Sequence, residues 1–306
     1  MPADDTPGHR RKIAVLGPVA PDMRAGLADD YDLLDAAGVA ALGPGARAAI
    51  THGISNAMAG AKVADVAHLP GLTTIVSLGA GMDAYDVPGL AARDVIVEAT
   101  GSVMTEDTAE AAVALTFALL RRVVSNDGFV RQGDWSRGRA PMGWRVSGRK
   151  VGIVGLGRIG SRVAEKLSAL GCDVAYTGRS AKDVVWRFEP DLMALARSVD
   201  VLILCCVGGD ATRGIINEAV LRELGAQGFV VNVSRGSVVV EEDLLDALER
   251  GVIAGAALDV FENEPNPDRR FLEVPNCILQ PHAAVFTHEN RSDLLAELKR
   301  LFTEYR

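Results

Sequence analysis

The sequence predicts an α/β fold made of two doubly wound domains, each built on a parallel sheet. Its 306 residues, 48% of them hydrophobic and 24% charged, are enough for two domains with sizeable cores. Apolar segments of strand length alternate with helical segments in two series, one near residues 11–100 and one from residue 150 onward. Such βαβ series form parallel sheets that are covered by helices on both faces. A glycine turn opens the second series.

The first series contains five expected strands and a turn of interest. The strands are expected at residues 12–16, 32–36, 48–51, 73–78 and 95–99, with helices such as Pro21–Ala28 between them. Gly79, Ala80 and Gly81 follow the fourth strand. A glycine-bracketed turn exposes backbone N–H groups, so it either binds a carboxylate or is simply a tight turn.

A long apolar helix is expected at residues 106–123, with Thr105 or a neighbour as its cap. It is too apolar on all sides for a helix with one solvated face, so we expect it to lie between layers or against a partner subunit. The following loop, residues 133–144, carries two tryptophans. Such a loop either closes a pocket or packs into the core.

The second series begins with a cofactor-binding pattern. An apolar strand at 151–154 runs into Gly155, Gly157 and Gly160, which hold the G-x-G-x-x-G spacing. The first glycine makes a tight turn, the second lets the backbone approach a pyrophosphate, and the third lets helix pack on strand. The helix that begins at Arg158 and Ile159 would direct free N–H groups at that pyrophosphate.

The next strand, 173–177, indicates which dinucleotide is bound. About 20 residues past the glycines, an NAD-binding fold usually has an acidic residue for the ribose 2′-hydroxyl. This chain has Arg179 there, with Ser180 and Lys182 close by. A guanidinium suits a 2′-phosphate, so NADP(H) is the preferred cofactor and NAD(H) the alternative. The other interpretation of Arg179 is a solvated surface arginine.

Three later strands end in residues that suit carbonyl reduction. Segments 229–234, 253–260 and 277–280 lead to Arg235, Glu264 and His282. In an open α/β sheet, ligands bind outside the carboxyl ends of the strands. Arg235 would bind and polarise the substrate, and His282 would protonate the alkoxide. Glu264 beside the imidazole would stabilise its protonated form.

Composition excludes several other functions. The net charge of −8 gives no reason to bind nucleic acid or an anionic membrane. Residues 1–10 form a polar tail without the apolar core of a signal peptide, and no apolar run is long enough to span a membrane. The four cysteines lack metal-ligand spacing, and the adjacent pair Cys205 and Cys206, in an expected strand at 201–207, is expected to be buried and unbridged. No metal is expected, and a reducing cytoplasm fits.

Seven segments resemble, in order and spacing, the D-isomer-specific 2-hydroxyacid dehydrogenases. They are 79–83, 105–110, 133–135, 155–160, 232–236, 257–265 and 281–282, and they extend over nearly the whole chain. The turn from Tyr176 to Arg179 looks most like that of the glyoxylate/hydroxypyruvate reductases, including the hydroxyphenylpyruvate-reducing branch. The resemblance implies Rossmann-like and flavodoxin-like domains and NADPH-dependent reduction of a small 2-oxo acid to the D-2-hydroxy acid.

The resemblance also implies residue roles. Arg235 would bind the substrate's carboxylate and carbonyl, with His282 as acid/base and Glu264 as its partner. Asp259 would hold the nicotinamide carboxamide. The backbone at Ala80 and Gly81 would bind the substrate carboxylate, which favours the ligand-binding interpretation of that turn.

The domains implied by the resemblance are discontinuous. A cofactor domain, residues 104–283, would be inserted into a substrate domain formed by 1–103 and 284–306. Family members are usually homodimers through the cofactor domain, which would give the helix at 106–123 a partner. The chain departs from the family pattern in Ala283-Ala284-Val285 after His282, and it ends at Arg306, before the segment that usually returns to the substrate domain.

The sequence pattern is also compatible with other functions. An NAD(H)-dependent dehydrogenase of another substrate, a cofactor-sensing corepressor and a methyltransferase also use this type of fold, but neither of the last two needs the Arg/Glu/His set. The sequence leaves open the reaction's physiological direction and the 2-oxo acid, whose pocket would be shaped by His52, Gly53, Ile54, Met82 and the loop 135–144.

Overall fold

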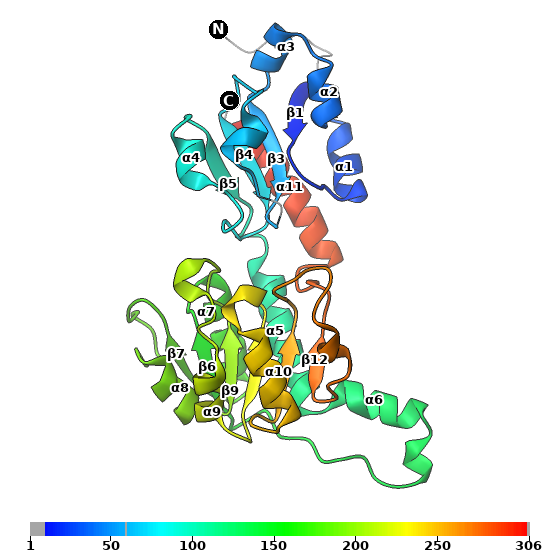
Figure 1. Cartoon of the computed structure of the whole chain (residues 1–306), viewed down its shortest axis with the longest axis vertical. Coiled ribbons are helices and arrows are strands. Elements are labelled where there is room, and N and C mark those ends of the chain that lie inside the picture. The colour runs from blue at the N-terminus through cyan, green and yellow to red at the C-terminus, as the bar shows by residue number, and fades with distance from the viewer. Residues whose placement is uncertain (1–9, 59, 305–306) are drawn as a thin grey trace. The chain divides into compact units, whose positions relative to one another are not determined.

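A computed structural model describes residues 10–58 and 60–304 of the chain (Figure 1). The chain divides into two compact units, one comprising Met1–Met104 with Thr287–Arg306 and the other Thr105–Phe286. Both sheets are built from parallel strand pairs. The α/β class with two parallel sheets is therefore confirmed. Residues 1–9 of the polar tail expected at residues 1–10 lie outside the described residues.

The first unit is built on a sheet with the strand order β2-β1-β3-β4-β5. This order is that of flavodoxin-like doubly wound folds. The strands are β1 (Arg11–Val15), β2 (Tyr31–Leu34), β3 (His52–Asn56), β4 (Thr74–Leu78) and β5 (Ile96–Ala99). The helices of this unit are α1 (Pro21–Ala28), α2 (Ala36–Ala40), α3 (Pro44–Ala48), α4 (Val87–Ala91) and α11 (His288–Glu304), with the 3-10 turn η1 at Val63–Val66.

The prediction of a strand at residues 48–51 is wrong. Pro44 begins α3 at its first turn, where proline is favoured, and the next strand is β3. Because β3 contains polar residues, it lacks the apolar pattern by which a buried strand is identified. It is nevertheless an interior strand of the sheet, between β1 and β4. Its Ser55 is fully buried and donates a 2.6 Å hydrogen bond to the carbonyl of Gly60. This hydrogen bond offsets the cost of removing the serine hydroxyl from water.

The C-terminal helix α11 belongs to the first unit. Arg291 and Lys299 form ion pairs with Asp22 (2.8 Å) and Asp30 (2.6 Å). Buried Asn290 donates a 3.1 Å hydrogen bond to the carbonyl of Val103. The expectation that the chain ends before a segment that returns to the first unit was therefore wrong, because α11 is that segment.

The second unit is built on a sheet with the strand order β12-β11-β10-β9-β6-β7-β8. Counted from β6, this is the Rossmann order 3-2-1-4-5-6 with one further strand, and the direction of winding reverses between β6 and β9. The strands are β6 (Lys150–Val154), β7 (Asp173–Thr177), β8 (Arg187–Phe188), β9 (Val201–Leu204), β10 (Phe229–Asn232), β11 (Gly255–Leu258) and β12 (Cys277–Leu279).

Helices cover this sheet, and a long one packs along its face. They are α5 (Thr105–Leu120), α6 (Val123–Arg131), α7 (Arg158–Ala169), α8 (Leu192–Ser198), α9 (Glu218–Leu224) and α10 (Glu241–Glu249), with 3-10 turns η2 (Asp134–Ser136), η3 (Asp210–Thr212), η4 (Gly236–Val238) and η5 (Arg269–Leu272). Ala109, Ala112 and Leu115 of α5 are buried in the same core as residues of β6, β9 and β10. One face of α5 is therefore buried against the sheet, whereas Glu110 and Ala114 are exposed. Packing of this helix against a partner subunit stays a prediction.

The expected helix at 106–123 ends three residues early, because Arg122 adopts a left-handed conformation with φ 56° and the chain turns into a separate helix, α6. The two tryptophans of the loop that follows differ. Trp144 packs edge-on against Phe229 with ring centroids 5.0 Å apart, whereas Trp135 is 70% exposed. Core packing therefore holds for Trp144 alone.

Candidate active site

The glycine turn joins β6 to α7 as predicted. Gly155 has φ +93°, and a Cβ there would lie 2.6 Å from Cα of Cys206. A Cβ at Gly160 would lie 2.2 Å from the carbonyl oxygen of Gly155. At Gly157, by contrast, a Cβ would meet no described atom within 4 Å. The first and third glycines are thus required by the fold, while the second leaves the backbone open to a ligand.

The N-terminus of α7 suits a pyrophosphate. The cap residue is Gly157, which offers no side-chain oxygen to the first N–H groups of the helix, including those of Arg158 and Ile159. Free N–H groups and the helix dipole together attract an anion. The residues present therefore fit a dinucleotide cofactor.

The turn after β7 holds the residues proposed to select the cofactor. Arg179 and Ser180 are exposed, and within residues 10–58 and 60–304 no carboxylate pairs with Arg179. Lys182 differs from them, because its ammonium donates to the carbonyl of Leu156 in the glycine turn. Its backbone N–H also donates to the hydroxyl of Tyr176 at 2.6 Å. Lys182 thus links this turn to the glycine turn.

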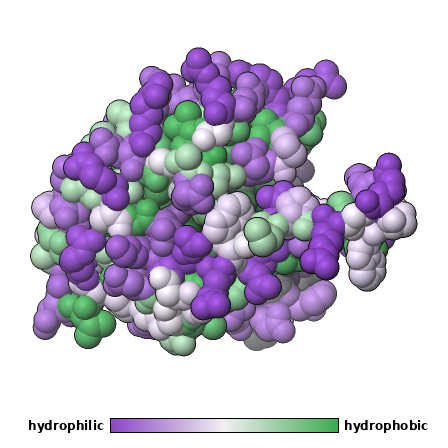
Figure 2. All heavy atoms as spheres, turned by 90° about the horizontal axis from the view of Figure 1, so that it is seen from below, coloured by the Kyte–Doolittle hydropathy of each residue, from purple (hydrophilic) through white to green (hydrophobic). Residues whose placement is uncertain are grey.

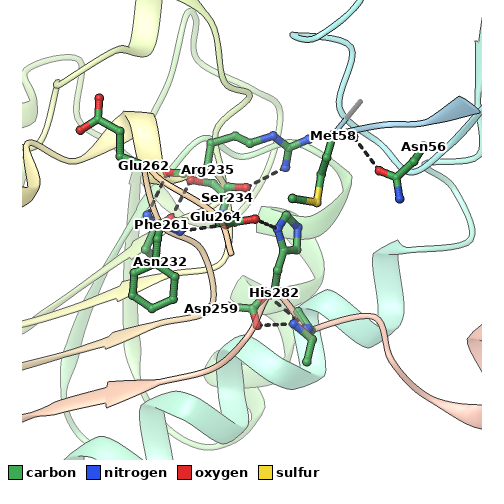
Figure 3. Close-up of polar contacts among 12 residues, drawn as sticks. Asn56, Met58, Asn232, Ser234, Arg235, Asp259, Phe261, Glu262, Glu264 and His282 are labelled. Carbon is green, nitrogen blue, oxygen red and sulfur yellow. Dashed lines mark hydrogen bonds and ion pairs between the residues drawn. The ribbon is translucent and has the colours of Figure 1, made fainter. Parts of the chain in front are cut away.

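Arg235, Glu264 and His282 lie at the carboxyl edge of the second sheet and are brought together (Figure 3). Nδ1 of His282 lies 2.8 Å from Oε2 of Glu264. The other carboxylate oxygen of Glu264 accepts the N–H of Phe261 at 2.9 Å. Because both oxygens are engaged, the carboxylate holds the imidazole in one orientation and leaves Nε2 for proton transfer.

The charges of this group interact. Burial is the largest influence on Glu264 and raises its pKa, but the hydrogen bonds from His282 and from the N–H of Phe261, with the charge of Arg235, outweigh it and the pKa is lowered. Glu264 is therefore a carboxylate around neutral pH. Its charge lies 2.8 Å from the imidazole that it orients.

The loop that carries Arg235 is held by a residue that the sequence did not single out. Asn232 is 1% exposed, and its side-chain amide donates to the carbonyl of Arg235 at 2.9 Å. Its carbonyl oxygen accepts from the N–H and the hydroxyl of Ser234 at 3.0 and 2.8 Å. Asn232 ends an apolar strand and begins the segment 232–236 that resembles the family, but neither signal reveals these partners.

Asp259 supports the turn that carries His282. Its carboxylate accepts the N–H groups of Ala283 and Ala284 at 2.7 and 3.2 Å, and its carbonyl accepts the N–H of His282 at 2.8 Å. His282 has φ 52°, a left-handed backbone conformation that residues other than glycine adopt only at an energetic cost. Burial raises the pKa of Asp259, an effect that the two N–H groups partly offset. The Ala283-Ala284 departure from the family pattern thus still provides two backbone donors.

Ala80 and Gly81 belong to the first unit, in the turn after β4. Gly79 has φ +141°, which a residue with a side chain rarely adopts. Within the described residues, no hydrogen bond uses the N–H of Ala80 or of Gly81. These donors are therefore available to a ligand.

The cysteines and possible metal ligands form no further site in the described part of the chain. Cys172, Cys205, Cys206 and Cys277 are free thiols, and burial raises the pKa of each, which keeps them protonated and unreactive. Cys205 and Cys206 lie just beyond β9, which ends at Leu204, rather than inside the longer strand expected. Among the described residues, no group of three His, Cys, Asp or Glu is placed to bind a metal, and no helix is long and apolar enough to cross a membrane.

Comparisons with known proteins identify the family. The profile of the family "D-isomer specific 2-hydroxyacid dehydrogenase, NAD binding domain" matches residues 113–284. A 2-ketogluconate reductase of Gluconobacter oxydans is 44% identical over 227 residues, 74% of this chain and 73% of that protein. A glyoxylate/hydroxypyruvate reductase of Arabidopsis thaliana is 40% identical over 78% of this chain and 76% of its own length.

Solved structures give the same result. An NADPH-dependent glyoxylate/hydroxypyruvate reductase of Sinorhizobium meliloti, in complex with NADP and malonate, superposes with a TM-score of 0.86 at 35% identity. The match covers 96% of this chain and 94% of that one. The family's cofactor domain extends over the glycine turn, Arg235, Glu264 and His282. The chain therefore belongs to the D-isomer-specific 2-hydroxyacid dehydrogenases, a family of oxidoreductases that use a nicotinamide cofactor.

Proposed function

We propose that this protein reduces a small 2-oxo acid to the D-2-hydroxy acid with NADPH, and that His282 is the general acid. The observation that carries the proposal is the 2.8 Å contact between His282 and Glu264, beside Arg235 at the sheet edge where the glycine turn lies. A binding protein that only senses the cofactor would have no use for an oriented imidazole.

The chemistry follows from where charge develops. The reduced nicotinamide, when bound, supplies the hydride to the carbonyl carbon. Negative charge then builds on the carbonyl oxygen, and the guanidinium of Arg235 stabilises it. His282 transfers the proton from Nε2 to that oxygen, while Glu264 keeps the imidazolium oriented. The N–H groups of Ala80 and Gly81 bind the substrate's carboxylate.

Cofactor preference is assigned to the turn after β7. Arg179 is exposed and unpaired by any described carboxylate, and hydrogen bonds from a guanidinium to a phosphate are charge-assisted. Arg179 and Ser180 would therefore bind the 2′-phosphate of NADPH. Lys182 would assist through the glycine turn, since its ammonium already contacts Leu156 there. The NADPH-dependent relative from Sinorhizobium meliloti supports this assignment.

The substrate that we assign is a small 2-oxo acid such as glyoxylate or hydroxypyruvate. Several relatives are named as glyoxylate/hydroxypyruvate reductases, which supports this assignment. A 2-oxo sugar acid is the second candidate, because the relative from Gluconobacter oxydans is a 2-ketogluconate reductase. The test is to assay glyoxylate, hydroxypyruvate, pyruvate, phenylpyruvate and 2-ketogluconate with NADPH and with NADH. Activity on one or more with NADPH is expected. Inactivity on all of them, with either cofactor, would refute the proposal.

We further propose that two copies associate through an arm formed by residues 121–149. The arm includes α6 and carries exposed apolar side chains, namely Val123, Val124, Val130, Trp135 and Met142. The arm contains seven arginines and two aspartates and is therefore positively charged, whereas the whole chain has a net charge of −8. The arm of one copy thus complements the acidic surface of a second copy. In Figure 2 a projection stands apart from the rest of the surface, on the side where Figure 1 places α6.

Sedimentation tests this assembly. The wild type is expected to sediment as a dimer, and Val124→Asp, which puts a charge on the apolar arm, should shift it toward monomer. Val185→Asp is the control, because Val185 is 94% exposed outside the arm. A monomeric wild type, or equal effects of both substitutions, would contradict the proposal.

A further inference from the structure

A fully buried hydroxyl holds the turn after β4. Thr100, the residue after β5, is 0% exposed. Its Oγ1 accepts the N–H of Gly79 at 3.0 Å and donates to the carbonyl of Ser77 at 2.9 Å. Its own N–H donates to the same carbonyl at 3.1 Å. One side chain thus joins the last residues of β4 to the first residue of the turn.

The turn is restrained from the opposite side as well. A Cβ at Gly79 would lie 2.7 Å from Cβ of Ala57, so the backbone of Gly79 is close to the turn that follows β3. Within the described residues, the N–H of Gly79 has one other acceptor, the carbonyl of Ser77 at 3.0 Å, which closes a three-residue turn. Without the Thr100 hydroxyl, the N–H of Gly79, the residue before Ala80 and Gly81, would keep the bond to Ser77 alone among its described acceptors.

We propose that Thr100 is a positioning residue that sets affinity for the carboxylate of the 2-oxo acid. The inference rests on the proposed function, in which the N–H groups of Ala80 and Gly81 bind that carboxylate. Hydrogen bonds to an anion depend on donor direction, so a looser turn binds the anion less well. The carboxylate does not change during the reaction, and its binding therefore contributes equally to ground state and transition state.

This role predicts a kinetic signature that a purely structural role does not. Loss of uniform binding raises KM and leaves kcat unchanged. The cofactor's KM should also stay unchanged, because the glycine turn belongs to the other unit. A hydroxyl that only satisfies the buried sheet edge would instead lower the melting temperature without changing KM for the oxo acid.

The experiment compares Thr100→Val, which keeps the shape but removes the hydroxyl, with Thr100→Ser, which restores it. Thr116→Val is the matched control, because Thr116 is also 0% exposed and donates a single 2.7 Å hydrogen bond to the carbonyl of Ala112 in α5. KM and kcat are measured for the best 2-oxo acid of the panel, together with KM for NADPH and inhibition by oxalate. Thermal melts accompany every variant.

Thr100→Val is expected to raise KM for the oxo acid and the oxalate inhibition constant about threefold to tenfold, the usual effect of one hydrogen bond. Thr100→Ser and Thr116→Val should resemble the wild type. If Thr100→Val does not fold, Thr100→Ala provides the same comparison. An unchanged KM, or a fall in kcat with a raised NADPH KM, would overturn the inference. A wild type inactive on every 2-oxo acid would instead refute the proposed function itself.

Discussion

Alanine substitutions at Gly157 and Gly160 should separate the two tasks of the glycine turn. At Gly160 a Cβ would lie 2.2 Å from the carbonyl oxygen of Gly155 and 3.2 Å from Cγ2 of Ile153. The oxygen is backbone and cannot rotate away, so β6 and α7 must separate. At Gly157 a Cβ meets nothing described within 4 Å, and φ −78° is allowed for alanine.

The magnitudes follow from these contacts. Overpacking of a core costs about 1–3 kcal/mol, and each kcal/mol shifts the melting temperature of a chain this size by about 2–4 °C. Gly160→Ala should therefore lower the melting temperature by about 2–12 °C without any ligand present. Gly157→Ala should change it by less than about 1 °C, because nothing is displaced. Its methyl group would instead hinder the pyrophosphate, whose charged hydrogen bonds contribute about 1.5–3 kcal/mol each, so the Kd for NADPH should rise at least about tenfold.

Thermal melts of the ligand-free protein and calorimetric titration with NADPH measure both quantities on the same samples. The reasoning is refuted if Gly157→Ala binds NADPH as the wild type does, since the open backbone would then not face the cofactor. It is also refuted if Gly160→Ala melts as the wild type does, since the close approach of α7 to the turn would then be unimportant.

Three further predictions concern charged side chains. Arg179→Ala should lower kcat/KM with NADPH about tenfold or more while barely changing it with NADH; an unchanged ratio in steady-state assays with both cofactors would leave Arg179 as a solvated surface residue. Glu264→Gln removes the carboxylate that holds the imidazole of His282 in one orientation, so kcat for reduction should fall, and an unchanged kcat would contradict this role. The hydrogen bond from Arg162 helps lower the pKa of Glu106 to about 2, so the stability it adds is complete above its usual value of 4.5 and lost as pH falls toward 2. Because Glu106 is 48% exposed, denaturant titrations of Glu106→Gln should show a deficit of no more than about 1 kcal/mol at pH 7 that disappears near pH 2; a deficit independent of pH would exclude the ion pair as its cause.

The elements that were predicted well are those whose residues carry a local signal. β6 and the start of α7 occur where the sequence places them to within one residue, because an apolar strand that runs into a fixed glycine spacing is a local signal. β3 was missed because its polar residues are buried only by virtue of neighbouring strands. The junction at Arg122 was missed because an arginine gives no local indication of a left-handed conformation.

The site shows the same division. The strand-end positions of Arg235 and His282 were predictable, since parallel strands align their carboxyl ends. The supports were not, because Asn232 and Thr100 act through partners that only the fold brings near. Asp259 was expected to hold the nicotinamide carboxamide, and that role stays a prediction. The structure adds its hydrogen bonds to the turn of His282, which depend on backbone groups that no motif displays.

The general acid is the central claim, and replacing it is the most direct test. His282→Ala removes the only proton donor assigned to the reaction, and general acid catalysis contributes about 10²–10⁴-fold, so kcat for the best 2-oxo acid should fall by that factor. The Kd for NADPH should stay unchanged, because the glycine turn is intact, and His288→Ala, at an exposed histidine that begins α11, should leave kcat as it is. A His282→Ala enzyme that retains near wild-type kcat would contradict the account.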